Sequence, residues 1–418
     1  MKTFTYISLG CKVNNYECSA LVDALIKEGY VLDDTNPDVA FINTCSVTAT
    51  ADQKSRQHIR KLRTLYPNAI IVVMGCYAQG NHNFIFNEIK PDIIVGTSNR
   101  NKIVDYIKEF EKTRVAIDAT ENSPRTFSYE DLGIVNYQEN VRAYLKIEDG
   151  CDNFCSYCII PYRRGKARSR DKESILLEAN DLLSKGYKEI VLTGINVSYY
   201  GQDLQEESFT KLVDALLKNK NLYRLRISSI EESDIDEGLI SLFKKDNLAK
   251  HIHVPLQSGS DTVLKRMNRK YLTSEFLAKM NMIRELAPDV ALTTDVIVGF
   301  PGETEEEFFE TYNFIKKCGF AMLHVFPYSS REGTVAARMN NQIDPKTKKE
   351  RCLKLIELSN ELWDKYTNKY INQEVEVLVE QYDKKNKWNI GHTSNYLEVI
   401  IPGEPIPVGT ITKTIYKK

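Results

Sequence analysis

Residues 144–165 read YLKIEDGCDNFCSYCIIPYRRG, a short apolar strand pattern that runs into a loop with three cysteines. Cys151, Cys155 and Cys158 follow the spacing C-x3-C-x2-C, so their thiolates can converge on one metal centre. A structural zinc site normally takes four protein ligands, but the next cysteine in the sequence is Cys318. Thiolates are soft ligands that favour iron–sulfur clusters. The loop therefore predicts a 4Fe–4S cluster held by three cysteines, with one iron open to another ligand.

An alternation of strands and helices continues after this loop. Apolar runs of strand length are separated by helical patterns, and a long helical stretch covers 345–370. The strand candidates are YLKIEDG at 144–150, EIVLTGINV at 189–197, RLRISSI at 224–230, HIHVPLQSG at 251–259, ALTTDVIVGF at 291–300 and MLHVFPYS at 322–329. Six β/α units predict a partial or complete (β/α) barrel, with its reactive groups at the carboxyl ends of the strands.

A second group of cysteines lies near the start of the chain. Three strand patterns each run into a cysteine, and these patterns are TFTYISLG at 3–10, VAFINT at 39–44 and AIIVVMG at 69–75. Because helical patterns separate them, the strands are expected to form a parallel sheet, whose carboxyl ends share one edge. We therefore expect Cys11, Cys45 and Cys76 to share one rim and to hold a second cluster. The alternative is three unrelated buried thiols.

The length of 418 residues implies two to four domains, because single cores rarely exceed roughly 250–300 residues. We assign residues 1–115 to an N-terminal parallel-sheet α/β domain and residues 137–368 to the central barrel. The polar segment between them has the composition of a linker. Residues 371–418 show period-2 alternation with Gly, Pro and Asn turns, which predicts a small all-β, barrel-like module. The expected fold class is α/β.

The overall composition is that of a folded globular protein. Hydrophobic residues make up 42% and charged residues 27%, while 56 Lys and Arg balance 57 Asp and Glu. This balance excludes a strongly basic nucleic-acid binder, so any RNA contact has to be local. We find no secretory signal pattern and no membrane-spanning run, which predicts a cytoplasmic protein without membrane contact. In that reducing compartment the nine cysteines are expected to be thiols or metal ligands.

The cysteine loop resembles the signature of the radical S-adenosylmethionine (SAM) enzymes, including the aromatic Tyr157 before its last cysteine. The resemblance implies a partial (β/α)6 barrel with the cluster loop after its first strand. It also implies that the open iron binds SAM. One-electron reduction then splits SAM into methionine and a 5′-deoxyadenosyl radical.

Further segments extend the resemblance to essentially the whole chain. They are GCKVN at 10–14, NTC at 43–45, GCYAQ at 75–79, HVPLQSGSDTVLKRMNR at 253–269 and DVIVGFPGET at 295–304. With them the sequence resembles the tRNA methylthiotransferases of the radical SAM superfamily, which carry a C-terminal TRAM module. GCKVN is most similar to the MtaB type, which acts on N6-threonylcarbamoyladenosine beside the anticodon.

The resemblance implies separate roles for two 4Fe–4S clusters. The cluster in the loop 151–158 generates the radical, and the N-terminal cluster carries the sulfur that is methylated and delivered to adenine C2. The expected product is the 2-methylthio derivative of N6-threonylcarbamoyladenosine. Within the same enzyme class, isopentenyladenosine in tRNA or an aspartate of a ribosomal protein is an alternative substrate. A non-catalytic, RNA-binding iron–sulfur protein is the alternative from a different class.

SAM contacts are expected at the carboxyl ends of the barrel strands. Thr193 and Gly194 stand where many radical SAM enzymes carry a GGE-type segment. The glycines after the fifth strand either let the backbone approach the adenine of SAM or form a plain tight turn. The full set of candidates is Tyr157, Thr193, Gly194, Ser228, Ser229, Glu231, Gly299, Pro301 and Gly302.

Two basic segments are candidates for contact with RNA phosphates. KSRQHIRKLR covers 54–63, and PYRRGKARSR at 161–170 adjoins the cluster loop. The basic residues of the second segment are Arg163, Arg164, Lys166, Arg168 and Arg170. Trp388 and Tyr396 either stack on bases or fill the small core of the terminal module. The expected partners are a tRNA anticodon stem-loop and an electron donor protein, and the expected state is a monomer.

The remaining cysteines and the histidines show no metal-binding pattern. We interpret Cys18, Cys318 and Cys352 as packing residues on helices. His253 is expected to be structural, with the lining of a substrate cavity as the alternative.

Overall fold

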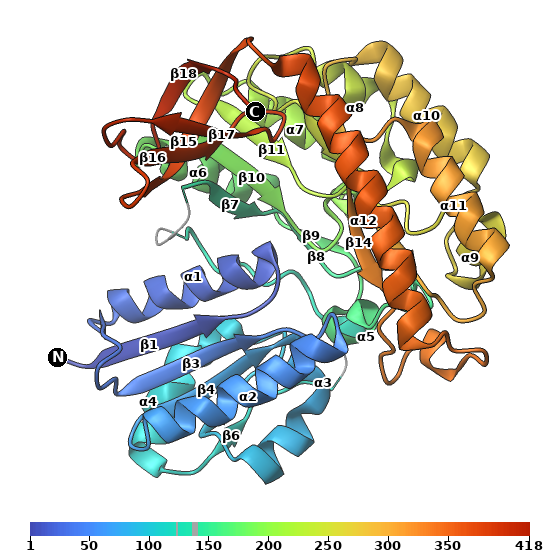
Figure 1. The fold of residues 1–418 in the computed structure, drawn as a ribbon. Coiled ribbons are helices and arrows are strands. Elements are labelled where there is room, and N and C mark those ends of the chain that lie inside the picture. Colours follow the sequence, from blue (N-terminus) through green and yellow to red (C-terminus); the bar gives the residue numbers. More distant parts are fainter. Residues whose placement is uncertain (123, 136–140) are drawn as a thin grey trace.

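The computed structural model describes residues 1–122, 124–135 and 141–418 (Figure 1). The expected start of the central domain at residue 137 lies outside the described residues. Within the described ranges, no helix is both long enough and apolar enough to cross a bilayer.

The N-terminal domain is a six-stranded sheet in which every pairing is parallel, in the order β2-β1-β3-β4-β5-β6. Its strands are β1 Thr3–Ser8, β2 Val31–Leu32, β3 Val39–Thr44, β4 Ile70–Gly75, β5 Ile93–Ile94 and β6 Ile117–Asp118. Its helices are α1 Lys12–Lys27, α2 Ala49–Leu65, α3 Cys76–Phe84 and α4 Ile103–Thr113. The sheet thus continues past residue 115 through β6, a strand too short to show in the sequence pattern.

Helices cover both faces of this sheet (Figure 1). Apolar residues of α1 and α4 pack on one face, and residues of α2 and α3 pack on the other. The two central strands, β3 and β4, are buried along their whole length, which explains their unbroken apolar sequences. The predicted parallel α/β domain is confirmed.

The central domain is a partial barrel. Its parallel strands form two groups, β11-β10-β7 and β12-β13-β14. A parallel bridge from Ser229 to His253 joins the two groups, so the six strands follow one another in chain order. These strands are β7 Ala143–Lys146, β10 Glu189–Thr193, β11 Arg224–Ile227, β12 His251–His253, β13 Ala291–Val298 and β14 Met322–Pro327. The predicted partial (β/α)6 barrel is confirmed.

Helices surround this barrel, and a two-stranded ribbon of β8 Glu148–Asp149 and β9 Arg168–Ser169 flanks the cluster loop. The helices are α5 Ile160–Arg164, α6 Lys172–Ser184, α7 Phe209–Leu217, α8 Glu237–Leu242, α9 Asp261–Arg266, α10 Thr273–Leu286, α11 Glu305–Cys318 and α12 Pro345–Thr367. Helix α12 lies along β14 at the end of the barrel, and α1 of the N-terminal domain faces β7 (Figure 1).

The C-terminal module is a four-stranded antiparallel sheet in the order β17-β16-β15-β18, which confirms the all-β prediction. Its strands are β15 Glu374–Asp383, β16 Trp388–His392, β17 Glu398–Pro402 and β18 Ile411–Ile415. Val377, Leu397 and Val399 of this sheet pack with Ala291 and Ala321 of the barrel in one apolar cluster. The module therefore shares its core with the barrel.

Candidate metal centres and the cavity beside them

The N-terminal cysteines lie at the carboxyl ends of three adjacent strands. Cys11 follows β1, Cys45 follows β3 and Cys76 begins α3 directly after β4. The strand order reverses between β1 and β3, and such a switch point is where open α/β sheets form their functional crevice. The structure therefore brings these three residues to one rim of the sheet.

Two glycines make this close approach possible. Gly10 and Gly75 directly precede a cysteine, and both have φ of +100°, a conformation that favours glycine. A Cβ atom added to Gly10 would stand 2.8 Å from the Sγ of Cys45. Burial raises the pKa of Cys76 to about 11, and the neighbouring thiols of Cys11 and Cys45 also raise it. The three thiols are thus electrostatic neighbours.

The loop cysteines also lie together. Burial raises the pKa of Cys158 to about 12, and Cys155 raises it further. The pKa of Cys151 is likewise raised, first by burial and then through Cys158 and Cys155 among its neighbours. The loop is held by Ser156, whose N–H donates to the carbonyl of Met267 at 2.9 Å and whose carbonyl accepts from Ala336 at 2.8 Å.

The residues directly after α9 support this loop through hydrogen bonds. The Asn268 side chain donates to the carbonyl of Phe154 at 2.9 Å. The Arg269 guanidinium donates to the Sγ of Cys155 at 3.4 Å and forms an ion pair with Glu231. Three residues directly after α9, Met267, Asn268 and Arg269, thus fix the loop and one of its thiols.

The two cysteine triplets face each other across the boundary between the domains. Cys76 influences the pKa of Cys158, and helices α3 and α5, which adjoin these two cysteines, are in contact. Among the described residues, no group of three or more His, Cys, Asp or Glu could hold a single metal ion. A cubane cluster spreads its ligands over several irons, so its thiolates stand further apart than the ligands of one ion. Each triplet fits such a cluster by donor type, donor number and placement.

A buried network of charges lies beside Cys76. Its cations are Arg100, Lys146, Arg164 and Arg168, and its carboxylates are Glu17, Glu130 and Asp149. The Nε–H of Arg164 donates to the Sγ of Cys76 at 3.2 Å. Four cations face three carboxylates in this set, so a thiolate at Cys76 supplies the fourth negative charge. The surroundings of this cysteine therefore suit a metal-bound thiolate.

The prediction that residues 163–170 present a basic face to RNA does not fit this network. Arg164, Arg168 and Arg170 are at most 5% exposed and have protein partners. Burial in these ion pairs keeps them from a phosphate at the surface. Arg163 is half-buried and Lys166 is exposed, so only these two members of the segment can reach a polyanion.

The structure separates the predicted SAM residues into groups. Thr193 and Gly194 lie beside Glu148, whose carboxylate accepts from the N–H groups of Ile195 and Asn196, at 2.8 Å in each case. Tyr157 packs against an apolar cluster that includes Phe300. Gly299, Pro301 and Gly302 lie together in a tight turn after β13. The Gly299 N–H donates to the Glu303 carboxylate at 2.8 Å and closes this turn.

The remaining SAM candidates lie on two sides of the barrel mouth. Glu231 is bound to Arg269, so it supports the cluster loop through that arginine. Ser228 donates to the carbonyl of Leu192 at 2.6 Å, and both Ser228 and Ser229 line a cavity inside the barrel.

This barrel cavity has a volume of about 650 Å³ and is lined by all three domains. The N-terminal domain contributes Lys12, the barrel contributes His253 and His324 among others, and the terminal module contributes Tyr396. His253 thus lines a cavity, the alternative given for it above. Trp388 lies outside this lining, at 37% exposure on β16.

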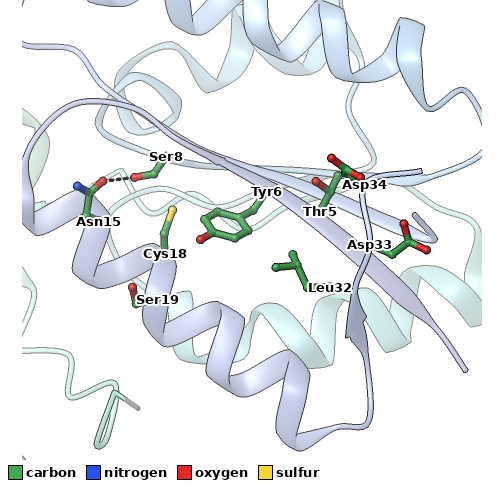
Figure 2. Close-up of a pocket in the computed structure, with 9 residues that line it drawn as sticks. All are labelled: Thr5, Tyr6, Ser8, Asn15, Cys18, Ser19, Leu32, Asp33 and Asp34. Carbon is green, nitrogen blue, oxygen red and sulfur yellow. Dashed lines mark hydrogen bonds between the residues drawn. The ribbon is translucent and has the colours of Figure 1, made fainter. Parts of the chain in front are cut away.

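A second cavity, of about 700 Å³, lies between β1, β2 and α1 (Figure 2). Its lining includes Cys18, Asp33 and Asp34 but no member of either cysteine triplet. Burial raises the pKa of Cys18 to about 12, so this thiol is unreactive. Cys18 is 1% exposed and packs with Leu21 and Val22 in the core of the domain.

Several residues that shape the site gave no signal in the sequence. Arg164 and Glu17 meet only because two domains dock, and Lys12 enters the cavity only because α1 faces the barrel. Asn268 and Arg269 lie in the segment 253–269, whose quoted motif was the available signal for them.

Sequence profiles of two families match the chain. The radical SAM superfamily matches residues 145–315, and the uncharacterized protein family UPF0004 matches residues 3–96. These two matches correspond to the barrel and to the N-terminal sheet. Each contains one cysteine triplet.

Curated relatives match over nearly the full length. The chain is 45% identical to the threonylcarbamoyladenosine tRNA methylthiotransferase MtaB of Bacillus subtilis, over 99% of this chain and 93% of that protein. It is 37% identical to the MtaB of Thermotoga maritima, with coverage of 97% and 91%. It is also 38% identical to a tRNA-2-methylthio-N(6)-dimethylallyladenosine synthase of Thermoanaerobacter, with coverage of 90% and 82%.

Solved structures share the fold at low sequence identity. The radical SAM methyltransferase TsrM from Kitasatospora setae, with cobalamin and a [4Fe-4S] cluster bound, superimposes with a TM-score of 0.63. The match covers 81% of this chain and 77% of TsrM at 14% identity. This likeness supports the architecture of a sheet domain joined to a partial barrel.

Proposed function

The chain belongs to the radical SAM tRNA methylthiotransferases, and from this membership we propose that it converts N6-threonylcarbamoyladenosine in tRNA to the 2-methylthio derivative. The observation that carries the proposal is 45% identity over 99% of the chain to a relative named for that reaction. The radical SAM profile spans the loop cysteines, so SAM and one 4Fe–4S cluster are its cofactors. A tRNA is its substrate.

Adenine C2 carries hydrogen and no leaving group, so its substitution requires removal of a hydrogen atom. When bound, SAM and the two clusters supply a carbon radical, a sulfur atom and a methyl group. The role of the protein residues is to hold these groups in position relative to one another. Cys151, Cys155 and Cys158 are the proposed ligands on the barrel side, and Arg269 orients Cys155 through its hydrogen bond.

We also propose a second 4Fe–4S cluster at Cys11, Cys45 and Cys76. Their shared rim, the contact of 3.2 Å from Arg164 to Cys76 and the excess of cations around it support this assignment. The anaerobically reconstituted protein should bind about eight irons, and a C11A/C45A/C76A variant should bind about four. Iron and sulfide analysis measures both values. A fully loaded wild-type protein with four irons would exclude the second cluster.

The substrate is tested by mass spectrometry of tRNA nucleosides. In a strain that lacks the gene, we expect N6-threonylcarbamoyladenosine to persist and its 2-methylthio derivative to disappear. The wild-type gene should restore the derivative, and a Cys155→Ala gene should not. If 2-methylthio-isopentenyladenosine disappears instead, the enzyme acts on the other adenosine.

We propose that the tRNA anticodon stem-loop contacts the outer face of α2 as well as Lys166. Lys54, Arg60 and Lys61 are exposed along this helix, where they can meet phosphates. An electron donor protein and a monomeric state remain part of the proposal. Replacement of Lys54, Arg60 and Lys61 by Gln should weaken tRNA binding and reduce its dependence on salt.

A further inference from the structure

The barrel cavity places a lysine directly beside the N-terminal metal rim. Lys12 is the first residue of α1, next to Cys11, and its side chain enters the cavity from the N-terminal domain. His253 and His324 on β12 and β14 line the barrel side of the same space. A group bound here would lie close to the sulfur-carrying site proposed above.

Lys12 has no counter-ion in this cavity. In the described ranges, no hydrogen bond or ion pair reaches its ammonium group. The Lys12 side chain is exposed to solvent, and the guanidinium groups of Arg226 and Arg142 lie near it. Glu189, a carboxylate near Lys12 that lies outside the cavity lining, is already bound to both of these arginines.

Other carboxylates of the lining do not compensate for Lys12. Asp295 lies 3.3 Å from His253 and is paired with it, and Glu398 lies on the exposed side of the terminal module. Burial has the largest effect on the pKa of His324 and lowers it. The ring of His324 is therefore neutral near pH 7. No carboxylate of the lining therefore forms an ion pair with the Lys12 ammonium group, and an anionic ligand in the cavity would supply this partner.

Aromatic rings form another part of the cavity lining. Tyr396 lies in the lining with the guanidinium of Arg226 at 3.9 Å from its ring centroid, and the ring of His251 meets its edge at 4.7 Å. Phe326 and Trp363 add further flat surface. Aromatic side chains of this kind can stack on a planar base. The lysine favours a negatively charged group.

We propose that Lys12 is a specificity residue, which binds the carboxylate of the threonylcarbamoyl group in this cavity. This inference rests on the proposed function. The threonylcarbamoyl group carries a carboxylate, whereas the dimethylallyl group named for other relatives is apolar and has no charge. An unpaired ammonium group favours the first and penalises the second, because the apolar group would leave the lysine desolvated without a partner.

The test uses two anticodon stem-loops that differ only in the carboxylate. One carries N6-threonylcarbamoyladenosine, and the other carries N6-(2-hydroxypropylcarbamoyl)adenosine, in which a hydrogen atom replaces the carboxylate. The reconstituted full chain is compared with Lys12→Gln, Lys12→Arg and the control Lys27→Gln, which removes an exposed charge from the last turn of the same helix. The readouts are kcat/KM, KM and the Kd of each stem-loop.

The wild-type enzyme should prefer the carboxylate substrate, and Lys12→Gln should abolish this preference. For the carboxylate substrate alone, we expect a rise of roughly 10- to 100-fold in KM and Kd, the usual effect of losing a hydrogen bond between charged groups. The uncharged stem-loop should respond little. Lys12→Arg should retain most of the preference, and Lys27→Gln should behave like wild type.

Different results overturn different parts of the proposal. A wild-type enzyme that leaves the threonylcarbamoyl stem-loop unmodified overturns the proposed function. An active wild type, together with a Lys12→Gln variant that keeps the full preference, overturns the role of Lys12 alone. Equal weakening of both stem-loops also overturns it, because Lys12 would then contact the RNA backbone. If Lys12→Gln loads iron poorly, the Kd values of the metal-free proteins decide the question in the same way.

Discussion

Arg164 forms hydrogen bonds with residues on both sides of the domain boundary. Its guanidinium is fully buried and donates to Glu17 at 2.8 Å, to Asp149 at 3.0 Å and to the Sγ of Cys76 at 3.2 Å. An arginine suits this position because its planar fork serves several acceptors and keeps its charge when buried. The residue therefore orients Cys76 and holds the barrel against the N-terminal sheet.

Replacement of Arg164 by Gln should destabilise the protein and leave tRNA affinity largely intact. Because Glu17 and Asp149 would lose a buried partner, we expect a loss of about 3–5 kcal/mol in the free energy of unfolding. Urea denaturation measures the loss. Lys166→Gln, an exposed neighbour in the same segment, should change stability by less than about 0.5 kcal/mol. A stable Arg164→Gln variant with weak tRNA binding would instead restore the RNA-contact interpretation.

Single residues differ in how far the sequence can predict them. The loop cysteines are predictable because their three thiols lie within eight positions of the chain. The basic run 163–170 misleads, because its compensating carboxylates, such as Glu17, come from another domain. Lys12 lies in the quoted motif GCKVN at 10–14, but its place in the cavity could not be predicted, because a cavity between domains leaves no local pattern.

Among the elements, α9 and α11 show how the cluster loop is supported from outside. Glu307 in the first turn of α11 forms a capping box with Thr304 and an ion pair of 2.6 Å with Arg266, the last residue of α9. The residues that follow Arg266 bind the cluster loop. The capping pattern T-x-x-E at 304–307 is visible in the sequence, but the partner helix is not.

This ion pair should make stability depend on pH. Burial alone would raise the pKa of Glu307, but hydrogen bonds from Arg266 and Thr262 outweigh burial and lower the pKa to about 2, from an ordinary 4.5. The stabilisation is therefore complete above pH 4.5 and is lost as the pH falls towards 2. Between pH 5.5 and pH 3.5, the difference in unfolding free energy between wild type and Glu307→Gln should shrink by about 1 kcal/mol. A difference that stays constant with pH would contradict this assignment.

Element boundaries show the same limit of sequence reasoning. The apolar pattern predicts a helix from about Tyr16, but α1 begins at Lys12. The first turn of α1 shows no apolar periodicity in the sequence. It begins after Cys11, at the N-cap position, and the side chain of Asn14 holds it in place. Asn14 donates to the carbonyls of Leu9 and Thr44 at 2.6 and 3.1 Å. These contacts belong to the rim and not to the apolar face.

At the scale of the whole molecule, one charged hub joins the two larger domains. Glu17 of α1 receives Lys146 of β7 at 2.9 Å and Arg164 of α5 at 2.8 Å. A separate ion pair of 2.6 Å joins Asp52 of α2 to Arg331 beyond β14. Both connections lie next to residues that follow the strand ends, so the same contacts that dock the two domains also hold the rim on which the N-terminal cysteines lie.

Glu17→Gln should uncouple the two domains. Removing the buried carboxylate leaves Lys146 and Arg164 with less compensation, which costs about 3–5 kcal/mol. Calorimetry should show a lower melting temperature or two separate transitions where the wild type has one. Glu111→Gln breaks the surface pair with Lys2 and weakens at most one long hydrogen bond of 3.5 Å from the Tyr30 hydroxyl, so the control should change stability by less than about 1 kcal/mol. Unchanged melting of Glu17→Gln would show that the hub does not link the domains.

The barrel cavity has a further consequence for the order in which the protein is made. Lys12 and Tyr396 both line this cavity, but most of the chain separates them. Lys12 is therefore synthesised long before Tyr396. A nascent chain that has completed the barrel still has an open pocket. Because the terminal sheet shares its core with the barrel, it folds onto a surface already in place. Translation that stops before residue 396 therefore leaves the cavity without Tyr396 and leaves Ala291 and Ala321 of the barrel without the apolar side chains that cover them.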